Sequence, residues 1–255
     1  MKTITVLEKA YGKHRKFALR AFRHSLSVDL EGLEVLIGKL YTNPHSWVVV
    51  ELEGEDWEVA SNLIQQYYGT ICSFGELKAG QVRKGKLIQT GKYGYGLYAD
   101  IGIDSEERID AFIPLHAIRH QLVKNEKIPL RDISYACGFL DNFTLEISID
   151  RIDSIKENIQ ASLSSEQVQL FKKWMKLNLE RLIVTGVTRK HLKKVIGETG
   201  HINDILAIER MGLLEQVVVC KEGTNAPGLL AEIGRFLPEA LISLFIPEKV
   251  RAILA

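Results

Sequence analysis

The sequence has few cysteines and no long apolar run, and these absences exclude several classes of protein. Its three cysteines, Cys72, Cys137 and Cys220, lie far apart and form no CxxC pair, which argues against a disulfide framework and a cysteine zinc site. No run approaches the ~18 apolar residues of a membrane helix, and the first residues alternate like a strand rather than forming a signal peptide. We therefore expect a cytoplasmic protein with no membrane partner.

An excess of charge of one sign is also missing. The 255 residues include 33 Lys and Arg against 32 Asp and Glu, so bulk charge does not favour binding to a polyanion. Any nucleic-acid surface must therefore be local.

Motifs for catalysis and metal binding are absent from the sequence. None of the seven histidines belongs to an HExxH motif or pairs with cysteine, and His116 with His120 supplies two ligands at most. The glycines of residues 91–96 lack the GxGxxG order of a dinucleotide site. We expect no catalytic residues, no metal and no cofactor. A small-molecule site assembled across domains would, however, leave no such spacing.

The first third of the chain alternates between strand and helix patterns. Residues 3–7 and 47–52 read as strands, residues 14–40 as a helical region, and residues 57–68 as a helix. This order predicts a small α+β domain over residues 1–77.

A cationic stretch runs from Lys9 to Arg23, with six Lys and Arg residues and no acid. Phe17 and Phe22 fit the buried side of an amphipathic helix, in which case the cations are merely solvated. Alternatively, the stretch is a docking surface for ribosomal RNA or another polyanion, formed above all by Lys13, Lys16 and Arg20. The sequence leaves both readings open.

Residues 81–117 carry the most specific pattern of the chain. A cationic β run leads into Tyr93-Gly94-Tyr95-Gly96-Leu97-Tyr98-Ala99-Asp100-Ile101-Gly102, followed by a polar loop and a third run. This pattern resembles the core of an S1-type OB-fold, in which an aromatic-Gly-x-aromatic-x-Asp-x-Gly strand presents rings on the outside of a small barrel. The resemblance implies a barrel over residues 78–153. Where the family has His-x-Ser, this chain has Pro114-Leu115-His116, so one expected base contact is missing.

The S1 resemblance also implies an RNA surface. Tyr95 and Tyr98 would stack on bases, while four nearby cations contact phosphates: Arg83, Lys84, Lys86 and Lys92. Strict alternation places Tyr95 and Tyr98 on opposite faces of the strand unless the glycines introduce a bulge. Aromatic residues are also common in strands that bind nothing, so a purely structural role stays open.

Beyond residue 153 the pattern changes to helix, and we expect a linker helix over 154–180 and a further domain over 181–255. The segment from Val195 to Ile205 resembles the KH signature Val-Ile-Gly-x-x-Gly-x-x-Ile-x-x-Ile. The resemblance implies a second helix over residues 201–206. In KH proteins the GxxG turn, here Gly197 to Gly200, lets the RNA backbone approach two helix N-termini.

The charges around this turn favour opposite conclusions. Glu198 would repel a phosphate, whereas the preceding helix offers four cations, Arg189, Lys190, Lys193 and Lys194, unless these form only a solvated face. The loop over residues 223–228 reads as a strand-to-helix turn capped by Thr224 or Asn225, with a phosphate- or partner-binding loop as the alternative.

The order of these parts resembles the RNA-binding cap subunits of the exosome, and the whole chain is similar to an archaeal protein family without assigned function. We predict a multidomain α+β fold, in which a central S1-like OB β-barrel is flanked by α/β-layer domains, the C-terminal one KH-like. The implied function is a non-catalytic RNA-binding adaptor of an RNA-processing, ribosomal or transcription assembly. The alternative is a protein-interaction module of such a ribonucleoprotein or transcription complex, whose OB and KH-like folds no longer bind RNA.

Overall fold

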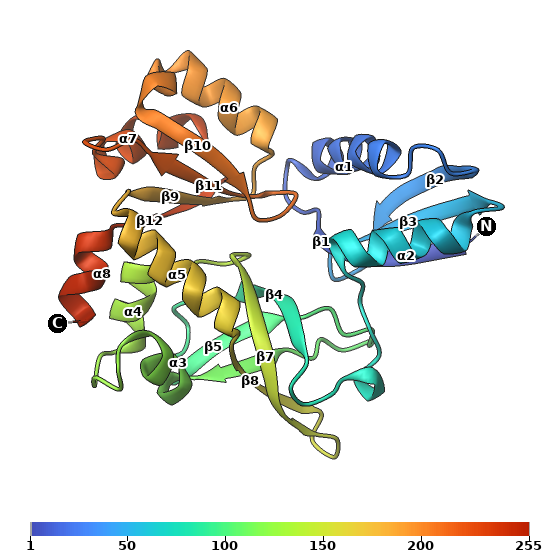
Figure 1. Cartoon of the computed structure of the whole chain (residues 1–255), viewed down its shortest axis with the longest axis horizontal. Coiled ribbons are helices and arrows are strands. Elements are labelled where there is room, and N and C mark those ends of the chain that lie inside the picture. Colours follow the sequence, from blue (N-terminus) through green and yellow to red (C-terminus); the bar gives the residue numbers. More distant parts are fainter. Residues whose placement is uncertain (1, 255) are drawn as a thin grey trace.

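The computed structural model describes residues 2–254, which form three parts (Figure 1). An N-terminal sheet with two helices lies at the right, a barrel below, and a second sheet with its helices at the upper left. Among residues 2–254, no helix is long and apolar enough to cross a membrane.

The N-terminal part is an antiparallel sheet in the order β1-β3-β2. Its elements are β1 (Lys2–Lys9), α1 (Arg15–Asp29), β2 (Val35–Thr42), β3 (Trp47–Gly54) and α2 (Trp57–Tyr68). Alternate residues of the central strand, Val48 and Val50, share one core with Phe22 of α1 and Ile64 of α2. Both helices therefore cover the same face of this sheet.

The predicted helical region over residues 14–40 is correct only as far as Asp29. Residues 35–42 form β2 instead, which pairs with β3 from Val35 opposite Gly54 to Thr42 opposite Val48. The apolar residues of this segment fit both the 3.6-residue period of a helix and the two-residue period of a strand. The segment forms a strand because β3 supplies its backbone hydrogen-bond partners.

The central part is a closed five-stranded barrel in the order β4-β5-β6-β8-β7, an OB-like architecture. The strands are β4 (Val82–Ile88), β5 (Gly96–Asp100), β6 (Ala111–Pro114), β7 (Thr144–Asp153) and β8 (Asn158–Leu163). Two short helices, α3 (Leu115–Leu122) and α4 (Leu130–Cys137), connect β6 to β7.

The predicted linker helix over residues 154–180 is wrong in its first part. β8 lies there and closes the barrel, parallel to β6 and antiparallel to β7. Its alternately buried residues, Ile159, Ala161 and Leu163, have the period of a strand. The helix α5 (Ser165–Leu177) begins only after it, where the Ser164 side chain accepts a hydrogen bond from the Gln167 backbone.

The C-terminal part has the order βαββαβ with an antiparallel sheet β10-β11-β9-β12, which is the ferredoxin-like arrangement. Its elements are β9 (Arg181–Thr185), α6 (Arg189–Glu198), β10 (Ile205–Arg210), β11 (Glu215–Cys220), α7 (Ala226–Ile233) and β12 (Leu241–Phe245). A final helix, α8 (Pro247–Leu254), lies beside α4 of the central part (Figure 1).

The predicted helix over residues 201–206 is wrong, and the KH-like architecture is not confirmed. A KH domain has a helix on each side of its GxxG turn, whereas here only a short 3₁₀ turn at His201–Asp204 precedes β10. Gly200 has a φ of +83°, the left-handed conformation that commonly follows the end of a helix. The two glycines therefore mark the end of α6.

The C-terminal sheet is covered on both faces. Leu182 and Val218 face a core that includes Leu192 of α6 and Leu229 of α7. The intervening residues of these strands, such as Ile183 and Val217, point to the other face of the sheet. They pack in the core of the barrel together with residues of α4 and α5. Every residue of β9 and β11 is consequently buried, which explains why these strands read as continuous apolar runs.

Buried ion pairs connect the three parts. Lys86 of β4 donates to Glu215 of β11, with Nζ and Oε2 2.6 Å apart, and Tyr11 donates to the other oxygen of Glu215 at 2.8 Å. Lys9 of β1 pairs with Asp100 of β5, with Nζ and Oδ2 2.5 Å apart. All four charged side chains are at most 4% exposed. Because an unpaired charge at such depth is costly, each pair holds two parts of the chain together.

Lys86→Met should lower the free energy of unfolding by about 3–5 kcal/mol, because Glu215 would stay buried without its cation. Lys84→Met is the matched control, since Lys84 lies two residues away on the same strand and is exposed. Its effect should stay within about 0.5 kcal/mol. Urea unfolding of the two variants checks this, and equal losses would show that the pair contributes nothing specific.

Candidate nucleic-acid interface

Four aromatic rings gather on the outside of the barrel. Tyr98 of β5 lies directly opposite Phe112 of β6, with ring centroids 5.1 Å apart. The Tyr93 ring lies 5.4 Å from each of the Tyr95 and Tyr98 rings, and the hydroxyl oxygens of Tyr95 and Tyr98 are 3.3 Å apart. Tyr95 is 54% exposed. We call Tyr93, Tyr95, Tyr98 and Phe112 the aromatic cluster.

The glycines explain why Tyr95 and Tyr98 lie on the same side. β5 begins only at Gly96, so Tyr95 precedes the regular strand and is free of its alternation. A Cβ atom on Gly96 would lie 2.3 Å from Cε2 of Phe112, so any other residue would push this ring out of the cluster.

The hydrogen bond with Tyr95 raises the pKa of Tyr98 to about 12. The Tyr98 hydroxyl therefore stays protonated near neutral pH, and its uncharged ring suits stacking on a base.

Lys92 is the predicted cation that lies beside the cluster. Its Nζ atom is 5.0 Å from the centroid of the Tyr93 ring, and its side chain is exposed. A phosphate next to a base stacked on these rings is within its reach.

One predicted phosphate contact is wrong: Lys86 is 2% exposed and paired with Glu215, so it is not presented to a nucleic acid. Arg83 is partly exposed and donates from Nη2 to the backbone oxygens of Thr70, at 2.9 Å, and Ile101, at 3.3 Å. Phosphate contact by Arg83 therefore stays a prediction.

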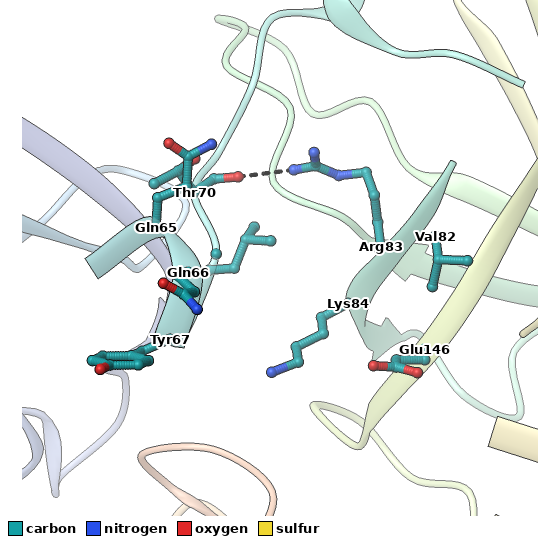
Figure 2. A pocket seen from close by; sticks show the side chains of 10 residues that line it. Gln65, Gln66, Tyr67, Thr70, Val82, Arg83, Lys84 and Glu146 are labelled. Atoms are coloured by element: carbon teal, nitrogen blue, oxygen red, sulfur yellow. Dashed lines mark hydrogen bonds between the residues drawn. The ribbon is translucent and has the colours of Figure 1, made fainter. Parts of the chain in front are cut away.

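Lys84 points into a polar pocket of about 290 Å³ between α2 and β4. Figure 2 shows its amino group between Tyr67 and Glu146, while Arg83 turns away toward Thr70. Lys84 lies opposite Glu146 in the β4–β7 ladder, and Tyr98 lies opposite Ile88. Four residues of extended strand, roughly 13 Å, therefore separate Lys84 from the aromatic cluster.

The structure brings the two cationic helices predicted from sequence next to each other. His14 is the N-cap of α1 and His191 lies in the first turn of α6, and their ring centroids are 4.7 Å apart. In Figure 1 both helices lie along the upper side of the molecule. Seven cations that the sequence predicts to contact RNA are exposed here: Lys13, Lys16 and Arg20 beside or on α1, and Arg189, Lys190, Lys193 and Lys194 on α6. We call these seven residues the basic surface.

Both helices meet at their N-terminal ends, which carry partial positive charge and attract anions. Arg20 also lines a groove between α1 and β2, together with Arg23 and His24. The positive charge that the whole chain lacks is thus concentrated at one junction of two domains.

The structural basis predicted for the GxxG turn is wrong. The amides of Thr199 and Gly200 donate to Val195 and Gly197 within the end of α6, at 3.0 and 3.1 Å. The carbonyl end of a helix carries partial negative charge, which disfavours a phosphate. RNA contact by Gly197 and Gly200 stays a prediction that this geometry does not favour.

The loop over residues 223–228 is a helix start. The Asn225 side chain accepts a hydrogen bond from the Gly228 backbone at 2.7 Å, and a proline lies in the first turn of α7. This confirms the prediction of a capped strand-to-helix turn.

The sequence did not predict a cluster of three side chains of the types that bind metal ions. His14, His191 and Glu239 place one donor atom each within 4.8 Å of one another. They come from three distant segments of the chain, so no spacing motif announces them.

The comparisons with known proteins identify the family. Residues 3–73 match the DUF2110 N-terminal domain, residues 77–175 the DUF2110 central domain, and residues 179–245 the DUF2110 C-terminal domain. The chain therefore belongs to the DUF2110 family. The central match includes β8 and most of α5, which agrees with a barrel that extends beyond residue 153. No curated protein matches.

Solved structures show only weak likeness. A complex of a/eIF2alpha, aDim2p and rRNA from Pyrococcus horikoshii contains a chain with 16% identity and a TM-score of 0.26, covering 49% of this chain and 64% of that chain. The alpha subunit of aIF2 from Pyrococcus abyssi has 11% identity and a TM-score of 0.26, covering 66% of this chain and 97% of that chain. Scores this low carry no argument about fold or function.

Replacing Lys13, Lys16 and Arg20 with Gln should weaken binding to single-stranded RNA and flatten its salt dependence. Each lost phosphate contact reduces the slope of log K against log salt by about 0.7. The control replaces three exposed cations of α5 with Gln: Lys172, Lys173 and Lys176. Anisotropy titrations at several salt concentrations measure both slopes. A slope that changes equally in both triple variants would exclude α1 as a specific RNA surface.

Proposed function

We propose that this protein is a non-catalytic adaptor that binds single-stranded RNA in the cytoplasm, as part of a larger RNA-processing, ribosomal or transcription assembly. The observation that carries the proposal is the aromatic cluster on the outside of the barrel, with Lys92 beside it. Stacked bases gain about 1–3 kcal/mol each on such rings, with little dependence on sequence.

The basic surface supports the same proposal by a separate physical effect. Its seven cations would hold phosphates, and the N-terminal ends of α1 and α6 add to their attraction. One strand of RNA that reaches both sites would be held by stacking on the barrel and by charge at the junction of the outer domains. Because the Tyr98 hydroxyl stays protonated at pH 7, this ring offers recognition without acid–base chemistry.

One observation favours the alternative of a protein-interaction module. Lys86 and Arg83 are engaged inside the protein, so of the four cations predicted to contact RNA beside the tyrosines, only Lys92 lies against the cluster. Exposed tyrosine rings are also typical of protein interfaces.

Tyr95→Ala and Tyr98→Ala should each weaken RNA binding about 5- to 150-fold, the equivalent of 1–3 kcal/mol of stacking. Tyr135→Ala is the matched control, since Tyr135 is an exposed tyrosine of the same domain on α4, outside the cluster. Fluorescence anisotropy with a labelled single-stranded RNA of mixed sequence measures the affinities. Unchanged affinity in both cluster variants, with unchanged melting temperature, would leave the protein-interaction alternative.

A further inference from the structure

Three side chains with metal-binding chemistry converge where the N-terminal and C-terminal parts meet. His14 lies immediately before α1, His191 in the first turn of α6, and Glu239 in the segment that leads into β12. His14 is buried, and the other two are partly buried. We propose that His14, His191 and Glu239 form a zinc site that links the two outer parts of the chain.

The distances suit this ligand set. Nε2 of His14 and Oε1 of Glu239 are 2.7 Å apart, and all three donor atoms lie within 4.8 Å of one another. Tetrahedral zinc bonds of about 2.0–2.2 Å would separate the donors by roughly 3.3–3.6 Å. The shortest distance must therefore widen by roughly 0.6–0.9 Å and the longest must shorten by roughly 1.5 Å at most, which rotation of the side chains can supply.

The backbone holds the two histidines in place before any ion binds. The His14 carbonyl accepts the first hydrogen bond of α1 from Ala18 at 2.9 Å, and the His191 amide donates to the Thr188 side chain at 3.3 Å. Among residues 2–254, no hydrogen bond to either ring nitrogen of His191 is found, so a ring nitrogen is free to bind an ion. A site built on helix starts is preorganised in the way that metal binding requires.

The donor types also suit zinc. Two imidazoles and a carboxylate form a zinc set with three protein ligands and an open fourth position.

Nearby positive charge opposes the ion but does not prevent binding. The charge of Lys13 interacts electrostatically with Glu239, and the charge of Lys194 with His191. Both amines are exposed. Water and salt screen exposed charges, whereas the Glu239 carboxylate would contact the ion directly. The expected consequence is a single zinc ion that fixes α1 against α6, whether or not RNA binds.

Isothermal titration of the chelator-treated full chain with Zn²⁺ tests this inference. We expect one zinc per chain in the wild type and an affinity at least about 100-fold lower in His191→Ala and in Glu239→Gln, since even outer partners of a ligand change affinity 10- to 100-fold. His24→Ala is the control, because His24 is exposed on α1 away from the cluster, and its affinity should not change. The thermal unfolding midpoint should rise with Zn²⁺ in the wild type and the control only.

Circular dichroism without metal checks that the variants are folded. Glu239→Gln adds a second safeguard, because its amide keeps the size of the side chain while removing the charge. Co²⁺ titration supplies an independent readout, since its visible absorption intensifies in a four-coordinate site. Zinc affinity that is equal in the wild type and both ligand variants, or no zinc binding by the folded wild type, would overturn the inference.

Discussion

The arrangement of this protein depends on charges removed from water where its three parts meet. Lys86 of the barrel and Glu215 of the C-terminal sheet neutralise each other, and Tyr11 of the N-terminal part completes the hydrogen bonding of the carboxylate. Lys9 and Asp100 form a second buried ion pair, between the N-terminal sheet and the barrel. Near them, Leu213 and Leu214 of the C-terminal part enter the N-terminal core. Since each ion would be costly without its partner, the parts are matched to one another rather than merely tethered.

The same junction decides which cations remain available for binding. Lys86 pairs with Glu215 and Arg83 donates to the Thr70 carbonyl oxygen, so these contacts within the protein compete with binding to a phosphate. Among the cations predicted to contact RNA, Lys92 lies beside the aromatic cluster and seven others lie on or beside α1 and α6, where the outer parts meet. A chain with almost equal numbers of acidic and basic residues can therefore present a cationic surface, because its charges are unevenly distributed over the structure.

The contact of His14 with His191 and Glu239 gives this junction a second possible function. If it binds zinc, the metal fixes the two cationic helices relative to each other, and the geometry of the basic surface then depends on metal occupancy. Binding of anions beside a cation site is not contradictory here. The lysines and arginines of the basic surface are exposed, whereas the Glu239 carboxylate beside buried His14 supplies negative charge at the proposed zinc site.

Local signals in the sequence were enough to predict part of the fold. The S1-like pattern of residues 81–117 predicts, by resemblance, the OB-like strands with Tyr98 on β5 and Tyr95 just before it, and the helices at residues 57–68 and after Thr188 follow from period and capping. The other elements depend on contacts between distant segments. Residues 35–42 form a strand because β3 supplies their backbone hydrogen-bond partners. Residues 201–206 do not form the predicted helix: α6 ends at the left-handed Gly200, and only a short 3₁₀ turn follows. The burial of Lys86 depends on a contact with a residue 129 positions away, and His14 meets a histidine 191 − 14 = 177 positions away. No local pattern encodes such contacts.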